Sequence, residues 1–188
     1  MREQPMTRHS LILHPDFECD TVRSLDVEIA RAKPGVLTLA YRLKGKTADL
    51  HLPTLATPAR TDELWRRTCF EAFVKPAPGE AYFEFNIAPS GQWATYGFSG
   101  YRADMSSPAE GVEPAIQSRI TADLYELDVV LDLSRLPNVG ADWRLGVSAV
   151  IEEASGRKSY WALTHPPGKA DFHHADGFAL EIPRDVRA

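Results

Sequence analysis

Apolar and polar side chains alternate with a period of two along most of this chain, and this pattern constrains the fold most. Residues 81–88 show it most clearly, because four apolar side chains alternate there with Tyr82, Glu84 and Asn86. The same alternation recurs in residues 36–43, 68–75, 124–133 and 143–153. A period of two places successive side chains on opposite faces of a strand. The pattern therefore predicts a chain made largely of β-strands.

Turn-forming residues separate these segments at short intervals. Pro34-Gly35 precedes residues 36–43, Pro76-Ala77-Pro78-Gly79 follows residues 68–75, and Pro89-Ser90-Gly91 follows residues 81–88. Proline and glycine at such positions mark the ends of strands. Further strands are expected at residues 24–32, 92–98, 115–122, 159–163 and 177–182, whereas the polar residues 100–111 read as a long loop.

About ten short strands without a convincing long helix predict an all-β fold. The expected architecture is an antiparallel β-sandwich of the jelly-roll or immunoglobulin-like kind, with a closed barrel as the alternative. The 188 residues contain no internal repeat and no linker. We therefore expect one domain over residues 1–188, within the usual size of a single β-domain.

Charge and hydropathy exclude several classes of partner. Lys and Arg number 21 against 26 Asp and Glu, a net charge of −5, so no basic footprint for nucleic acid is expected. No run of 18 apolar residues predicts a membrane span, and no signal peptide is visible, so we expect a cytoplasmic protein, with an exported mature form left open. Cys19 and Cys69 lack metal-ligand spacing and are expected to be independent thiols, a bridge being the alternative. The oligomeric state is left open.

The first candidate site surrounds Trp65, which stands just before the strand at residues 68–75. Glu71 alternates there with apolar neighbours, as Glu84 and Asn86 do on the next strand. If the two strands pair, the three polar side chains share one exposed sheet face with an aromatic side chain at its rim. Such a face suits a polyhydroxylated ligand, although a plain solvated surface with an incidental Trp is the simpler alternative.

These residues belong to a longer pattern that resembles a known family. The pattern consists of the Trp65-to-Glu71 spacing, Val74-Lys75-Pro76, residues 82–91, Trp143-Arg144-Leu145-Gly146 and residues 158–163. Together they resemble the DOMON-like superfamily, and within it the bacterial branch similar to family 9 carbohydrate-binding modules. The resemblance extends from Arg8 to Ile182.

The resemblance implies a β-sandwich that binds a ligand, usually a sugar or a haem, without catalysis. In the sugar-binding branch two tryptophans hold a terminal sugar, and a Glu with nearby polar groups bonds its hydroxyls. Trp65 and Glu71 match the first Trp and the Glu of that pattern, and Trp161 is the candidate for the second Trp.

One departure from the family pattern bears on the ligand. The acidic residue expected between the Trp and the Glu is absent, and Arg66 and Arg67 stand in that stretch. Two arginines would favour an anionic group such as a uronate or phosphate, although one of them could instead pair with Glu71.

The second candidate site is a segment rich in histidine at residues 165–176. It contains His165, His173 and His174 among carboxylates. Adjacent His173 and His174 on an extended segment would point in opposite directions, so one of them is expected to close the rim of a ligand site. The spacing matches no closed zinc pattern.

Two other function classes remain open at this stage. A haem- or metal-binding domain would use Met105 with a histidine, although no cofactor is expected as the first choice. A carboxylate-based hydrolase would use Glu71 and Glu84 as an acid–base pair. The preferred prediction is a module that binds a carbohydrate or other small polar ligand without catalysing its conversion.

Overall fold

The alternating segments form eleven strands, and no α-helix occurs in residues 6–107, 112–138 and 140–184, which the computed structural model describes. None of the helices in these ranges is long and apolar enough to cross a membrane. The strands are β1 (Thr7–Leu13), β2 (Val22–Lys33), β3 (Val36–Gly45), β4 (Cys69–Pro76), β5 (Tyr82–Ile87), β6 (Trp93–Phe98), β7 (Ala115–Ile120), β8 (Leu124–Asp132), β9 (Trp143–Glu152), β10 (Lys158–Ala162) and β11 (Leu180–Ile182). The short 3-10 helices are η1 (Thr47–Asp49), η2 (Leu64–Arg66) and η3 (Ala175–Gly177).

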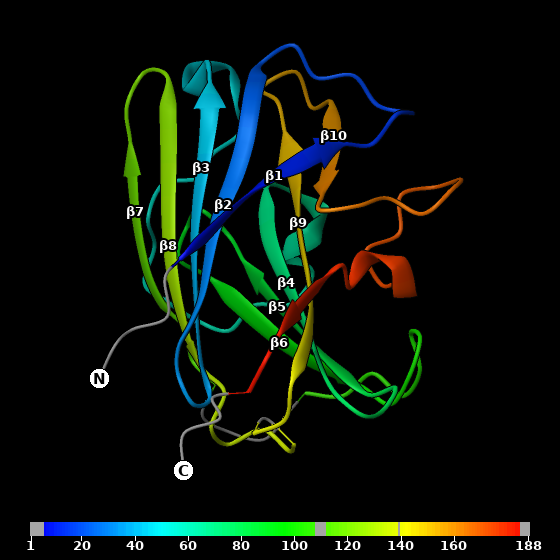
Figure 1. Ribbon diagram of the computed structural model, residues 1–188. Coiled ribbons are helices and arrows are strands. Elements are labelled where there is room, and N and C mark those ends of the chain that lie inside the picture. The colour runs from blue at the N-terminus through cyan, green and yellow to red at the C-terminus, as the bar shows by residue number, and fades with distance from the viewer. Residues whose placement is uncertain (1–5, 108–111, 139, 185–188) are drawn as a thin grey trace.

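The strands pair in one antiparallel order, β6-β5-β4-β9-β10-β1-β2-β3-β8-β7, with β11 also paired to β9. This order curls into two layers that face each other (Figure 1). We call β6-β5-β4-β9-β10 the β4 layer and β2-β3-β8-β7 the β3 layer. Within the described residues β6 and β7 are the two ends of the order, so the strands form a sandwich rather than a closed barrel.

β1 joins the two layers. Residues 7–11 pair with β2, whereas Ile12 and Leu13 pair with Ala162 and Trp161 of β10. The sequence does not predict this strand, because Leu11 is its single buried residue and Ile12 is exposed. A strand at the corner of a sandwich needs no alternating pattern, since neither of its faces is fully covered.

The core fills the space between the layers with the side chains that the alternation assigns to the inside. Leu37, Leu39, Tyr41 and Leu43 of β3 meet Phe70, Ala72 and Val74 of β4 across this space, and all are buried. The Tyr41 hydroxyl donates to the Glu71 carbonyl oxygen at 3.0 Å, which joins the two layers. The predicted β-sandwich and its inward faces are therefore confirmed.

The outer face of the β4 layer differs from expectation, because it is covered. Glu71, Glu84 and Asn86 share this face as predicted, but all three are buried. A second apolar cluster lies on the same face and includes side chains from η2 and from the segment before β11. Its members are Phe73, Tyr82, Ala94, Tyr96, Phe98, Phe178, Leu64 and Phe172. Tyr82 of β5 and Tyr96 and Phe98 of β6 point to this face, so it is itself apolar enough to need covering.

The edge of β6 is also covered by neighbouring segments. The amide of Thr61 donates to the carbonyl of Trp93 at 2.8 Å, and the amide of Gly97 donates to the carbonyl of Ser106 at 2.8 Å. The predicted loop at residues 100–111 therefore begins by pairing with β6, and its residues 108–111 lie outside the described ranges.

Candidate functional site

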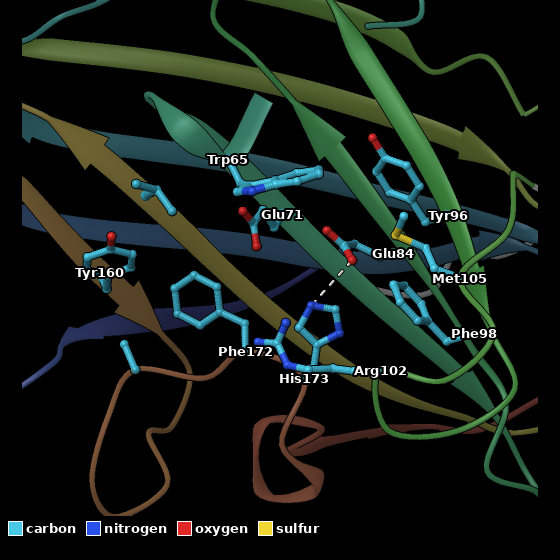
Figure 2. Close-up of a pocket in the computed structure, with 12 residues that line it drawn as sticks. Trp65, Glu71, Glu84, Tyr96, Phe98, Arg102, Met105, Tyr160, Phe172 and His173 are labelled. Carbon is cyan, nitrogen blue, oxygen red and sulfur yellow. Dashed lines mark ion pairs between the residues drawn. The ribbon is translucent and has the colours of Figure 1, made fainter. Parts of the chain in front are cut away.

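A cavity of about 520 Å³ lies on the outer face of the β4 layer, beneath the segment that joins β10 to β11 (Figure 2). Strands β4, β5, β6, β9 and β10 supply its floor, and η2 and two loops supply its walls. It is lined by Trp65, Glu71, Glu84, Tyr96, Phe98, Arg102, Met105, Val150, Tyr160, Ala170, Phe172 and His173.

Two carboxyl groups from adjacent strands form the polar part of the floor. Glu71 is 3% exposed and Glu84 is 6% exposed. Ser148 Oγ donates to Glu71 Oε2 at 3.4 Å, and Asn86 Nδ2 donates to Glu84 Oε1 at 2.7 Å. Glu71 lies directly opposite Asn86 in the ladder, and Asn86 Oδ1 is buried without a hydrogen-bond partner. Next to the floor, the protein thus leaves one buried acceptor oxygen, Asn86 Oδ1, without a donor.

Burial changes the protonation of both carboxyl groups. It raises the pKa of Glu84 to about 7, against the opposing effects of the Asn86 hydrogen bond and the Arg102 charge. It raises the pKa of Glu71 well above its usual range, and the charge of Glu84 adds to this shift. Near pH 7 the floor therefore retains at least part of its protons, because water does not solvate two adjacent carboxylates there.

His173 closes the floor on the side of Glu84 and is held in one tautomer. The Tyr82 hydroxyl accepts from the Arg102 amide at 3.2 Å, so its own proton is available to His173 Nδ1 at 2.7 Å. We assign the imidazole proton to Nε2, which lies 3.6 Å from Glu84 Oε2. Burial, helped by the charge of Arg102, lowers the pKa of His173 to about 4. At neutral pH this contact therefore joins a carboxyl group to a neutral imidazole.

The cationic side chain at the rim has its own partner. Arg102 Nη2 lies 2.8 Å from Asp171 Oδ1, and the Tyr101 hydroxyl donates to Asp171 Oδ2 at 2.6 Å. In the part of the chain that the structure describes, no ion pair joins a Lys or Arg to Glu71 or Glu84. Arg102 ties the loop after β6 to the segment before β11 and thereby shapes the rim.

Aromatic rings form the walls. Trp65 is 36% exposed and meets the Tyr96 ring edge-on, with 5.8 Å between ring centroids. The Tyr96 hydroxyl donates to Asp62 at 2.7 Å, which fixes its ring. Phe172 packs at 6.1 Å from Tyr160 on the other side. In Figure 2 the Trp65 ring lies across the cavity from Phe172, with the Glu71 carboxyl group between them.

The structure brings four of the predicted site residues together. Trp65, Glu71, Glu84 and His173 line one cavity. Asn86 does not line it, but its amide holds Glu84 in place.

Arg66, Arg67 and His174 lie apart from the cavity. Arg66 pairs with Glu63 at 2.9 Å, and Arg67 pairs with Glu152 at 3.2 Å. His174 Nδ1 accepts from the Asp176 amide and so caps η3. As predicted, the two adjacent histidines point to different surroundings.

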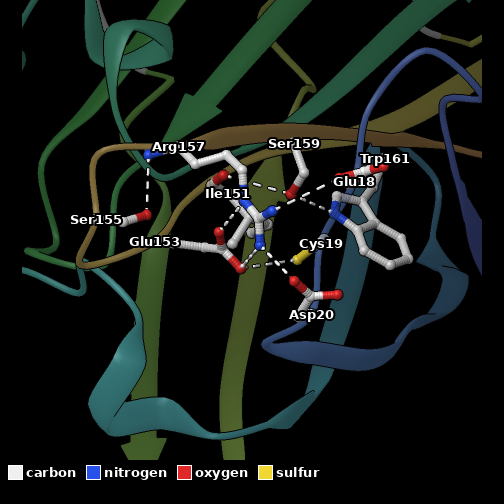
Figure 3. A network of polar contacts seen from close by, with 9 residues as sticks. All are labelled: Glu18, Cys19, Asp20, Ile151, Glu153, Ser155, Arg157, Ser159 and Trp161. Carbon is white, nitrogen blue, oxygen red and sulfur yellow. Dashed lines mark hydrogen bonds and ion pairs between the residues drawn. The ribbon is translucent and has the colours of Figure 1, made fainter.

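Trp161 packs in the core instead of forming the second wall. Its indole Nε1 donates to Ser159 Oγ at 2.9 Å (Figure 3). It lies opposite Ala149, whose side chain points inward, so Trp161 points inward as well. Tyr160, one residue earlier, takes the face that lines the cavity.

Eight of the twelve lining residues are not among the predicted saccharide-site residues, and one of these eight, Met105, is named from the sequence only as a possible haem ligand. Strand alternation could have found Tyr96 and Phe98, because the β5–β6 register places Tyr96 opposite Glu84. Alternation along β10 likewise places Tyr160 on the outer face, because Tyr160 lies opposite Val150 of β9. Arg102, Met105 and Phe172 belong to loops, and no periodic signal marks them.

The haem alternative receives a specific test from this geometry. Met105 and His173 both line the cavity, which brings a thioether and an imidazole to one site. However, His173 Nδ1 is bonded to Tyr82 and its Nε2 faces Glu84. Two buried carboxyl groups would also lie against the apolar porphyrin, so these residues do not fit haem. In the described ranges, no group of three or more His, Cys, Asp or Glu side chains is arranged to hold a metal ion, and both cysteines are free.

Comparisons with known proteins agree with this architecture. No family model matches the chain, and no curated protein matches it. A protein from Bacteroides uniformis ATCC 8492, described provisionally as carbohydrate-binding, superposes with a TM-score of 0.65 at 14% identity, over 92% of this chain and 84% of that chain. A family 9 carbohydrate-binding module from Caldicellulosiruptor kristjanssonii in complex with glucose gives a TM-score of 0.51 at 12% identity, over 91% and 80%. A family 9 module from the same organism in complex with cellotriose gives a TM-score of 0.50 at 11% identity, over 87% of this chain and 75% of that chain.

This chain shares their fold. The likeness to family 9 modules that the sequence pattern predicts therefore holds at the level of architecture.

Proposed function

We propose that this protein is a non-catalytic module that binds a saccharide in the cavity over the β4 layer. The observation that carries the proposal is an aromatic-walled cavity whose floor consists of two buried carboxyl groups. The fold shared with sugar-binding modules and the sequence resemblance to the DOMON-like superfamily support the same function.

The chemistry of the walls and floor matches the two kinds of surface on a sugar ring. Trp65 and Phe172 offer ring faces to the apolar C–H patches of a pyranose. Glu71 and Glu84 can accept hydrogen bonds from hydroxyl groups when ionised and can donate one when protonated. Because such a site leaves part of the ligand in water, we expect modest affinity.

Substitution of Trp65 tests the proposal. Trp65→Ala should weaken saccharide binding at least tenfold, since it removes one wall of the cavity, and calorimetry or a glycan array would measure this. Trp65 is partly exposed, so the thermal unfolding temperature should change little. Leu55→Ala is the control, because Leu55 is 69% exposed and does not line the cavity. Unchanged binding in Trp65→Ala would refute the role given to this side chain.

The hydrolase alternative is favoured by the burial of Glu84, which is 6% exposed and lines the cavity. A carboxyl group with a pKa of about 7, as in Glu84, suits a general acid at neutral pH. Turnover of a bound glycan that disappears in Glu71→Gln while binding persists would replace the binding-module proposal with this one.

A further inference from the structure

We propose that the preferred ligand is an unacetylated amino sugar, whose protonated amine is held by the carboxyl groups of the floor. This inference deepens the proposed function and rests on it, because it names the class of saccharide. The floor of the cavity carries acidic groups, whereas Arg66 and Arg67 suggest a basic site in the sequence.

Among the described residues no Lys or Arg forms an ion pair with the acidic groups of the floor, and the Arg102 charge reaches them only from the rim. Glu71 has Ser148 and Glu84 has Asn86 as hydrogen-bond donors, and both donors are neutral. Arg102, the cation of the rim, is paired with Asp171. Buried carboxyl groups are usually neutralised by a cation or retain a proton. A ligand with an ammonium group would supply the missing charge and up to three donors.

The walls suit the same group. A cation is attracted to the faces of aromatic rings, and this attraction is stronger where water is excluded. Trp65, Tyr96, Phe98 and Phe172 surround the space above the two carboxyl groups (Figure 2). Rings and carboxylates together form a setting in which an ammonium group is better stabilised than a hydroxyl group.

An anionic ligand fits this geometry poorly. Arg66 and Arg67, which suggest a uronate or phosphate in the sequence, are paired with Glu63 and Glu152 away from the cavity. A carboxylate placed on the floor would meet Glu71 and Glu84. Asn86 does not line the cavity, but its buried Oδ1 has no hydrogen-bond partner, so no donor of the protein is directed to this part of the sheet face.

Binding of an ammonium group should also move a proton. Near pH 6 Glu84 is largely protonated, and a cation beside it favours the ionised form, so up to one proton leaves the protein. The other titratable or charged groups around the cavity are Glu71 on β4, Tyr82 on β5, Tyr96 on β6, Tyr160 on β10, Arg102 in the loop after β6, and Asp171 and His173 before β11. A neutral sugar changes no charge and should release no proton.

Calorimetry on the full chain near pH 6 distinguishes these ligands. The probes are glucose, galactose and mannose, each with its 2-amino, 2-acetamido and uronic acid counterpart. We expect one amino sugar to bind at least tenfold more tightly than its neutral counterpart. Titrations in two buffers of different ionisation enthalpy should show proton release for the amino sugar alone.

Substitutions separate the charge effect from general damage. Glu71→Gln and Glu84→Gln should each reduce the ratio of amino-sugar affinity to neutral-sugar affinity to about threefold or less, because Gln removes the charge and keeps a side chain of similar shape. Glu181→Gln, at an exposed carboxylate on β11, should retain the full preference.

The outcomes are distinct. Equal affinity for amino and neutral sugars, or tighter binding of a uronate, would overturn this inference and leave the saccharide function intact. Absence of binding by every probe would count against the saccharide function itself. A preference for the amine that survives both Gln substitutions would overturn the role of the floor.

Discussion

Replacing Glu84 with glutamine should stabilise this protein at alkaline pH. The pKa of Glu84 rises from 4.5 to about 7 on folding, chiefly through burial. The folded state therefore holds the Glu84 proton more tightly than the unfolded chain does. By linkage, the contribution of Glu84 to the free energy of unfolding falls as pH rises from about 4.5 to about 7, and it remains low above pH 7.

The size of the effect follows from the two pKa values. Each pH unit between them changes the free energy of unfolding by about 1.4 kcal/mol, so ionising Glu84 costs about 3 kcal/mol above pH 7. Glutamine carries no charge at any pH and avoids this cost. Its neutral amide oxygen accepts a weaker hydrogen bond from Asn86 than a carboxylate does, which offsets about 1 kcal/mol. The net expectation at pH 8 is a gain of about 2 kcal/mol, or roughly 4–8 °C in melting temperature.

Urea unfolding at pH 5 and pH 8 measures this directly. At pH 5 Glu84 is protonated in the folded state and largely ionised in the unfolded state, so the cost is only about 1 kcal/mol and the advantage of glutamine should be smaller than at pH 8. Glu181→Gln is the control, because this carboxylate is solvated and its replacement should be neutral at both pH values. If Glu84→Gln is no more stable than the unsubstituted protein at pH 8, the buried carboxyl group does not carry the cost described.

Two further substitutions test other parts of the structure. Gly146→Ala would place a methyl carbon 2.9 Å from the carbonyl oxygen of Gly177. We expect the free energy of unfolding, measured in urea, to fall by about 1–3 kcal/mol, and saccharide binding, measured by calorimetry, to weaken as the cover of the cavity shifts. Gly140→Ala is the control, because a methyl group there meets nothing within 4 Å, and it should change neither quantity. Arg157 holds the pKa of Glu153 at about 2, mainly through a hydrogen bond (Figure 3). Arg157→Ala should therefore lower the free energy of unfolding by on the order of 1 kcal/mol near pH 7. As pH falls from 4.5 to 2, the stability of this variant should decrease less than that of the unsubstituted protein. The same decrease in both proteins would contradict this.

The sequence predicts the layers of this fold well, because each strand that is buried between two sheets alternates apolar inward residues with outward ones. Phe70, Ala72 and Val74 are apolar and lie two residues apart, so they share the buried face of β4. Glu71 then lies on the opposite face of the strand. Pairing of β4 with β5 follows from the turn between them and brings Glu71 and Glu84 onto adjacent strands.

What covers the outer face could not be read in the same way. Phe172 and Arg102 belong to segments without a periodic pattern. Arg102 is held by Asp171, which lies 69 residues away in the sequence. Trp161 shows a related limit, since one residue of register decides whether it or Tyr160 lines the cavity. The cytoplasmic location stays a prediction.

The segments that cover the edge of β6 have a consequence beyond ligand binding. An uncovered edge strand offers free amide and carbonyl groups to any other strand, and is a common starting point for aggregation. Here Thr61 and Ser106 occupy those groups, and they belong to the same stretches of chain that lead to Trp65 and carry Met105. Substitutions that reshape the rim of the cavity therefore also affect the solubility of the protein. Substitutions that alter ligand preference must leave the edge of β6 covered.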